Sequence, residues 1–260
     1  MTALASNVRT IVQYRWLLYE LVVRDLKLRY RGSLLGLAWT LLNPVVFMAI
    51  YALVFSVYLR TNIKDFPLYL LSGLIPWMWF AGAIGQSVTA IVDGRAYVGK
   101  TLLPTELLIY VPVLSNGLNF LITIALLFPL SLALGTDARW ALLFLPLMAL
   151  IELTMILGFS LLVATYNVFY RDLQQLVGYA VTALFFLTPI FYARASVPQN
   201  LQFLVLSPVA GLISAYQSVF YYGSPPNLLE LSFSAAFSFA ILIVALALFN
   251  RNRDAFGEYV

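Results

Sequence analysis

The chain contains no cysteine and no histidine. Their absence excludes disulfides, thiolate nucleophiles, zinc sites built from Cys and His, and histidine general bases. Charged residues are also scarce, at 10% of 260 residues, and the net charge is only +4. The positive charges are scattered between apolar stretches, whereas nucleic-acid binding needs a clustered basic face. We therefore expect no metal site, no catalytic site and no nucleic-acid partner.

Apolar residues, in contrast, make up 62% of the chain. A soluble domain is about half apolar and a quarter charged, so a soluble fold could not bury this excess. Runs of about 20 apolar residues are long enough to cross a bilayer. The sequence therefore predicts an all-α membrane protein with six transmembrane helices. The predicted spans are residues 34–59, 66–92, 106–134, 140–166, 173–193 and 230–250.

Residues 1–33 precede the first predicted span and differ from it. Apolar side chains recur near helical spacing, and most of the charged ones fall on another face. This pattern favours an amphipathic helix lying in the membrane interface, and a solvated leader helix is the alternative. No apolar core precedes Arg9 and Arg15, so we expect no cleavable signal peptide. Residues 34–250 form the predicted transmembrane domain, and 251–260 a short tail.

Residues 195–229, between the fifth and sixth predicted spans, carry no charge but are broken by prolines and glycines. The breaking residues are Pro198, Pro208, Gly211, Gly223, Pro225 and Pro226. The pieces between them are too short to cross a bilayer, so we predict short re-entrant helices. Irregular backbone at that depth must be satisfied by protein or water. The alternative is one extra broken span, which would place the C-terminus on the opposite side.

The distribution of Lys and Arg predicts the orientation. With six spans, eleven of these residues lie on the side of the two termini and four on the other side. Both termini are therefore expected in the cytoplasm, in a multi-pass protein of the cytoplasmic (inner) membrane.

Gly94–Thr101 fits the nucleotide-binding pattern G-x-x-x-x-G-K-[ST]. A functional loop of this type follows a strand and opens a helix within a nucleotide-binding domain. Here an apolar span precedes the loop, and Pro104 disfavours a continuing helix. We interpret the match as coincidence and expect no cofactor in this chain. The loop could instead dock into a partner and transmit motion, or be an ordinary connection.

Glu152 lies inside the fourth predicted span, where a carboxylate is costly and is a candidate for function. The sequence offers no evident basic partner within the spans, so the carboxyl could be protonated, near an interface or facing a water-filled lumen. Aromatic residues are frequent as well, and Phe47, Tyr51 and Phe55 share one helix face. Aromatic faces can stack on sugar rings, but packing and lipid contact are the more common uses.

Three stretches together resemble ABC-transporter permeases of the polysaccharide-export type. They are RYRGSLLGLAWTLLNP at residues 29–44, KTLLPTE at 100–106, and YRDL at 170–173 followed by TPIFY at 188–192. Each stretch alone is moderately specific. Their order and spacing are together more specific, and the resemblance covers nearly the whole chain.

The resemblance implies export of a lipid-linked polymer (O-antigen, capsule or teichoic acid) across the cytoplasmic membrane. Two permease copies would pair in the membrane lipids, and two separate ATPase subunits would bind ATP and magnesium. Contact with the ATPase would fall on Asp93, Gly94, Arg95, Ala96, Tyr97, Val98, Gly99, Lys100 and Thr101. The glycan path would involve Trp39, Phe47, Tyr51, Phe55, Phe185, Phe191 and Tyr192.

Three other functions remain open at this point. An ABC permease for a drug or a lipid would share the same sequence pattern. A membrane-embedded transferase or a proton-coupled transporter would need a cluster of buried titratable groups, whereas Glu152 is isolated and histidine is absent. We therefore expect an O-antigen exporter subunit that works as a homodimer.

Overall fold

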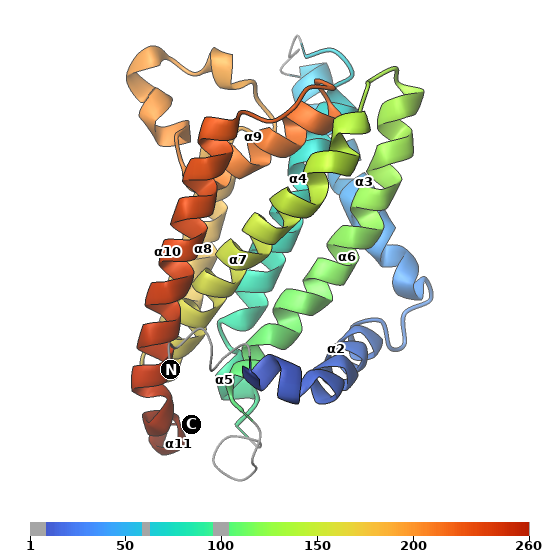
Figure 1. The fold of residues 1–260 in the computed structure, drawn as a ribbon. Helices are drawn as coiled ribbons and strands as arrows, with labels where there is room; N and C mark the ends of the chain where they lie inside the picture. The colour runs from blue at the N-terminus through green and yellow to red at the C-terminus, as the bar shows by residue number, and fades with distance from the viewer. Residues whose placement is uncertain (1–8, 59–62, 96–103, 260) are drawn as a thin grey trace.

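A computed structural model describes residues 9–58, 63–95 and 104–259. Within these residues all regular elements are helical, which confirms the all-α prediction (Figure 1). Four of the described helices are long and apolar enough to cross a membrane. These are α4 (Phe66–Ser87), α6 (Glu106–Ala133), α7 (Arg139–Phe169) and α10 (Leu228–Asn252).

Two further apolar helices are shorter, α3 (Trp39–Ala52) and α8 (Leu173–Leu187). α3 starts later than the predicted span because Gly32 and Gly36 adopt positive φ and turn the chain. A π-helical turn over Leu53–Tyr58 then extends α3. α8 stops before residue 193 because the residue ahead of Pro189 is forced into an extended conformation. Neither helix alone has the length expected of a span.

Helix α4 forms the centre of the bundle, and most of its side chains are buried. It begins after Asp65, whose φ of 46° is left-handed, and Pro67 suits the first turn of a helix. α4 packs against α6, α7 and α9 (Pro208–Phe220), and it also contacts α3 and α8. A short helix α5 (Ala90–Asp93) follows α4 directly.

Helix α2 (Arg15–Arg29) lies across one end of the bundle, where it packs against α6, and α5 and α11 (Phe256–Tyr259) lie at the same end (Figure 1). Leu18 and Val22 are buried against the bundle, whereas Trp16 and Tyr19 are exposed. Apolar side chains therefore occupy both faces of α2, and the division into an apolar and a polar face is weaker than expected. Exposed aromatics of this kind suit a helix at the membrane–water interface.

The opposite end of the bundle carries α9 and the turn between α6 and α7 (Figure 1). Two 3₁₀ turns, over Arg194–Ser196 and Gln199–Val205, lead from α8 to α9. Ser207 caps α9 by accepting a hydrogen bond from the backbone N–H of Ala210 at 3.0 Å. Arg194 forms an ion pair with Glu230 at 2.7 Å, which ties the first of these turns to the start of α10.

The α6–α7 turn ends α6 with Gly135, whose φ is 82°. Arg139 then donates two hydrogen bonds to Asp137, each 2.7 Å long. These bonds hold the pKa of the Asp137 carboxyl below its ordinary value. Both side chains are exposed, so the pair orders the turn but adds little stability.

Candidate functional site

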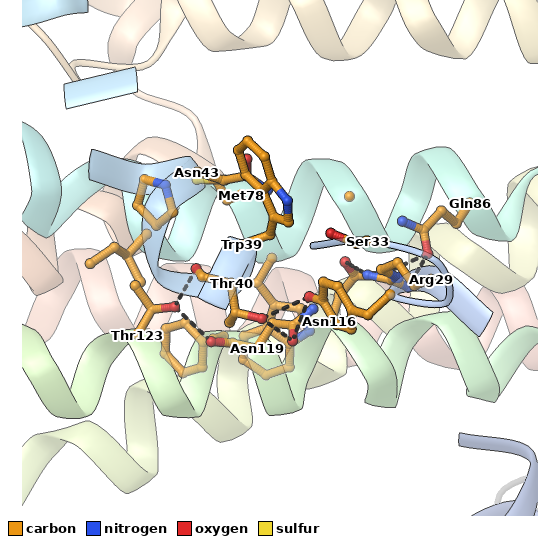
Figure 2. Close-up of a pocket in the computed structure, with 16 residues that line it drawn as sticks. Arg29, Ser33, Trp39, Thr40, Asn43, Met78, Gln86, Asn116, Asn119 and Thr123 are labelled. Atoms are coloured by element: carbon orange, nitrogen blue, oxygen red, sulfur yellow. Dashed lines mark hydrogen bonds between the residues drawn. The ribbon is translucent and has the colours of Figure 1, made fainter. Parts of the chain in front are cut away.

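A cavity of about 500 Å³ lies between the α2–α3 connection, α3, α4 and α6 (Figure 2). Figure 2 shows that α6 supplies one wall, through Asn116, Asn119 and Thr123. We call this space the Arg29 cavity. Its lining residues are Arg29, Tyr30, Ser33, Trp39, Thr40, Asn43, Pro44, Ile75, Met78, Trp79, Gly82, Gln86, Asn116, Asn119, Phe120 and Thr123.

The turn in the α2–α3 connection builds one side of the Arg29 cavity. A Cβ atom at Gly32 or Gly36 would meet no neighbour within 4 Å, so these glycines serve the backbone conformation. The reversal brings Tyr30 against the first turn of α3, where its hydroxyl lies 2.7 Å from the Thr40 hydroxyl. Residues 29–44, the first stretch of the resemblance, therefore fold into a single cavity wall.

Arg29 connects three helices at the rim of the cavity. Its Nη2 donates to Asp25 at 2.9 Å and to Gln86 at 2.8 Å, and its Nη1 donates to Asn116 at 3.2 Å. Asn116 in turn donates to Gln86 at 3.1 Å. A Cβ at Gly82 would come within 3.0 Å of the Asn116 side-chain oxygen, so this glycine makes room for the amide.

Deeper in the cavity, Asn119 accepts hydrogen bonds from the hydroxyls of Thr40 at 3.3 Å and Tyr30 at 3.5 Å. Within residues 9–58, 63–95 and 104–259, the amide of Asn43 and the Nδ2 of Asn119 form no hydrogen bond. The cavity thus offers unused amide groups beside the aromatic rings of Trp39, Trp79 and Phe120. Such a lining can hold a ligand that is both polar and ring-shaped.

All but one of the aromatic residues predicted to line the glycan path lie together in the structure, outside the Arg29 cavity. Phe47, Tyr51, Phe55, Phe185, Phe191 and Tyr192 make a continuous cluster with ring centroids 4.7 to 6.4 Å apart. Part of this cluster lines a groove of about 490 Å³ between α3, α4 and α8. Trp39 lies outside the cluster and lines the Arg29 cavity instead.

Glu152 has a neutral partner that the sequence did not reveal. The hydroxyl of Tyr216 in α9 donates to Glu152 Oε2 at 2.7 Å, and both side chains are almost completely buried. Phe120 packs edge-on against Tyr216, with ring centroids 5.9 Å apart. The pair joins α7 to α9 inside the bundle and lines neither of the two spaces described above.

Asp93, Gly94 and Arg95 are the described part of the predicted ATPase contact, and Ala96–Thr101 lie outside the described residues. Asp93 ends α5 and lines a groove of about 530 Å³ on the α2 side of the bundle. Arg29 and Gln86 line both this groove and the Arg29 cavity. The two spaces therefore meet at one pair of side chains.

Comparison with known proteins identifies the family to which this chain belongs. The ABC-2 type transporter family matches residues 17–221. The chain belongs to the ABC-2 type transporter family. It is 38% identical over 256 residues to the O-antigen export system permease protein RfbA of Myxococcus xanthus, covering 97% of this chain and 98% of the relative.

Two other relatives extend the range of similarity. The RfbA permease of Klebsiella pneumoniae is 31% identical over 250 residues, covering 93% of this chain and 95% of the relative. The polysialic acid transport protein KpsM of Escherichia coli is 24% identical over 243 residues, covering 90% and 93% respectively. The predicted resemblance to polysaccharide-export permeases is therefore confirmed.

In this ABC-2 transporter chain, the Arg29 cavity is the feature that sequence reasoning missed. A signal for it was present, because Asn116, Asn119 and Thr123 share one face of a single apolar helix. No group of three or more acidic side chains in the described parts of the chain could hold a metal ion.

Proposed function

We propose that this chain is the membrane-spanning subunit of an ATP-driven exporter that moves a lipid-linked polysaccharide, O-antigen, across the cytoplasmic membrane. The observation that carries the proposal is the near-full-length similarity to a permease named for O-antigen export. The aromatic cluster and the polar cavity agree with a carbohydrate cargo, since sugar rings stack on aromatic faces and bind amide groups. An exporter of drugs or other lipids remains the alternative cargo class.

The proposed topology has six spans. α4, α6, α7 and α10 would cross fully, and α3 and α8 would cross with the help of the segments that extend them. α9 and its two 3₁₀ turns would be re-entrant, since α9 is too short to cross and is tied to α4, α7 and α10. The end that carries α2, α5 and α11 would face the cytoplasm, in accord with its excess of Lys and Arg.

This topology predicts the labelling of two introduced cysteines in a chain that has none of its own. A cysteine replacing Asn62 should react with a membrane-impermeant maleimide added outside the cytoplasmic membrane of spheroplasts. A cysteine replacing Ala96 should react only after permeabilisation. Labelling of Ala96→Cys alone from outside would show that the orientation is inverted.

A second copy of the chain and two ATPase subunits would complete the exporter. The outer face of α3 and of the π-helical turn after it carries Val45, Val46, Ile50 and Leu53, whose side chains are 47–54% exposed. In a homodimer, such faces would meet lipid or the other copy, and the aromatic groove between α3, α4 and α8 would line the glycan path. ATP and magnesium would bind to the partner, and closure of the ATPases would push residues 93–101.

The contact with the ATPase can be tested by replacing Tyr97 and Lys100 with alanine together. In cells that lack their own permease, the wild-type chain expressed with its ATPase should restore surface O-antigen, and the double variant should lower its export about tenfold. The reason is that ATP-driven motion would no longer reach the spans. Surface polymer is quantified by immunoblotting, and complex assembly by affinity purification of the ATPase.

The matched control replaces Tyr222 and Lys64 with alanine, which removes the same side-chain types at the opposite end of the bundle. This control should export normally. Normal export by the Tyr97/Lys100 variant, with an intact complex, would show that these two side chains do not form the contact with the ATPase. Failure of the wild-type chain to restore any surface polymer would overturn the proposed function itself.

A further inference from the structure

The Arg29 cavity combines two kinds of binding group that are usually kept apart in a membrane protein. Its interior presents uncharged amides and hydroxyls beside aromatic rings, and its rim presents one guanidinium. The side chain of Asn43 is exposed and that of Asn119 is half-buried, so both unused amides are open to water or to a ligand that replaces it. The cavity is therefore suited to a ligand with a neutral polar part and an anionic part.

The interior groups favour a sugar as the neutral part. The amide of Asn43 can both donate and accept hydrogen bonds, and the Nδ2 of Asn119 can donate. Both face a space that Trp39, Trp79 and Phe120 also line. Vicinal sugar hydroxyls match this set of donors and acceptors, and a sugar ring can stack on Trp39, whereas Trp79 and Phe120 are buried and stacked on each other. A cavity of about 500 Å³ holds one or two sugar residues rather than a polymer.

The rim favours a phosphate as the anionic part. Arg29 is 26% exposed, and Gln86 and Asn116 engage its Nη atoms through neutral oxygens. A phosphate that takes the place of Gln86 would gain a charge-assisted, bidentate contact with the guanidinium. Asp25 remains bound to Arg29 and would weaken this contact without removing it, because the carboxylate is partly exposed.

The mouth of the cavity suits a lipid tail. Leu34 is fully exposed and Leu35 is 49% exposed, and both lie on the connection that carries the lining residue Ser33. Trp39, at the start of α3, is 38% exposed. An apolar chain attached to the phosphate could therefore leave the cavity along apolar side chains and enter the bilayer.

We propose that the Arg29 cavity binds the junction of a glycosylated lipid carrier, with its first sugars against Trp39, Asn43 and Asn119 and its phosphate on Arg29. The assignment rests on the proposed export function and adds to it a recognition site within each single chain. This site adjoins the aromatic groove between α3, α4 and α8, with which it shares the lining residues Met78 and Gly82. Since Arg29 and Gln86 also line the groove that contains Asp93, the occupied site would lie next to the predicted ATPase contact.

The test measures binding to the purified full chain in phospholipid nanodiscs by isothermal titration. Three probes separate the two parts of the ligand: a short prenyl diphosphate that carries one hexose, the same prenyl diphosphate without sugar, and the free hexose. The wild-type chain should bind the first probe at least tenfold more tightly than either of the others. Equal affinity for the sugar-free probe would show that no sugar is recognised and would overturn the proposal.

Two variants assign the contacts to this cavity. Asn43→Leu should weaken binding of the sugar-bearing probe about tenfold and leave the sugar-free probe unchanged, because it removes only sugar contacts. Arg29→Gln should weaken both diphosphate probes about tenfold or more. The side chain of Asn43 makes no hydrogen bond within the described residues, so its replacement should not disturb folding, which size-exclusion chromatography and thermal unfolding would check.

As a control, Asn252→Leu makes the same change on α10, away from the cavity, and this variant should bind the probes as the wild type does.

The proposal would be refuted if Asn43→Leu and Arg29→Gln bound the sugar-bearing probe with wild-type affinity while Tyr51→Ala lost binding. This result would place the ligand in the aromatic groove. Absence of probe binding to a wild-type chain that still exports polymer in cells would refute the site and leave the function standing. If the wild-type chain binds the probe but fails to export polymer, the site would stand and the proposed export function would be refuted.

Discussion

Replacing Gly158 with valine should lower the free energy of unfolding by about 3 kcal/mol, because α7 and α10 touch at this glycine. A Cβ atom at Gly158 would lie 2.8 Å from Ile241 Cγ2, 3.0 Å from the backbone nitrogen of Leu242 and 3.2 Å from the carbonyl carbon of Ile241. The first neighbour could rotate away, but the backbone atoms move only if the two helices separate. Small residues at such crossings allow membrane helices to approach closely.

The matched control is Gly178→Val on α8, where an added Cβ would meet no neighbour within 4 Å. Both variants replace a helical glycine by the same β-branched residue, so the difference between them reports the α7–α10 contact. Reversible unfolding in mixed detergent micelles would measure both free energies. Equal stability of the two variants would mean that α7 and α10 do not cross at Gly158.

The sequence predicted the apolar helices well because charge-free runs of sufficient length have few alternatives. The helix ends differ from the predicted span ends for local reasons. Gly32 and Gly36 hold back the start of α3 by turning the chain, and Pro189 ends α8 early. These residues were visible in the sequence, but hydropathy alone counts them as part of an apolar run.

The candidate sites were harder to predict, since they depend on contacts between distant residues. Tyr216 lies 64 residues from Glu152, within residues 195–229, for which the sequence allowed either short re-entrant helices or a broken span. No local sequence pattern could therefore pair the two side chains. Arg29 is 87 residues from Asn116 and 57 from Gln86. The aromatic cluster was largely anticipated because three of its members share one face of α3. Trp39 lies apart from the cluster because the turn at Gly36 directs it to the Arg29 cavity.

Replacing Tyr216 with phenylalanine should lower the free energy of unfolding by about 2 kcal/mol, because the buried Glu152 carboxyl would lose its hydrogen-bond donor. Glu152→Leu should cost a similar amount, since it leaves the Tyr216 hydroxyl buried without this partner. Glu152→Gln should cost less, because the amide oxygen can still accept the hydrogen bond. The same detergent unfolding assay applies.

The double variant Glu152→Leu/Tyr216→Phe decides whether the pair acts as a unit. It should be more stable than either of those single variants, because no unpartnered polar group is left behind, and the cycle should therefore yield a coupling of about 3 kcal/mol. If the chain exports O-antigen as proposed, a structural pair of this kind also predicts that Glu152→Gln supports export at the wild-type level. Loss of export in a stable Glu152→Gln protein would instead give the carboxyl a direct part in transport, through a proton that the amide cannot carry.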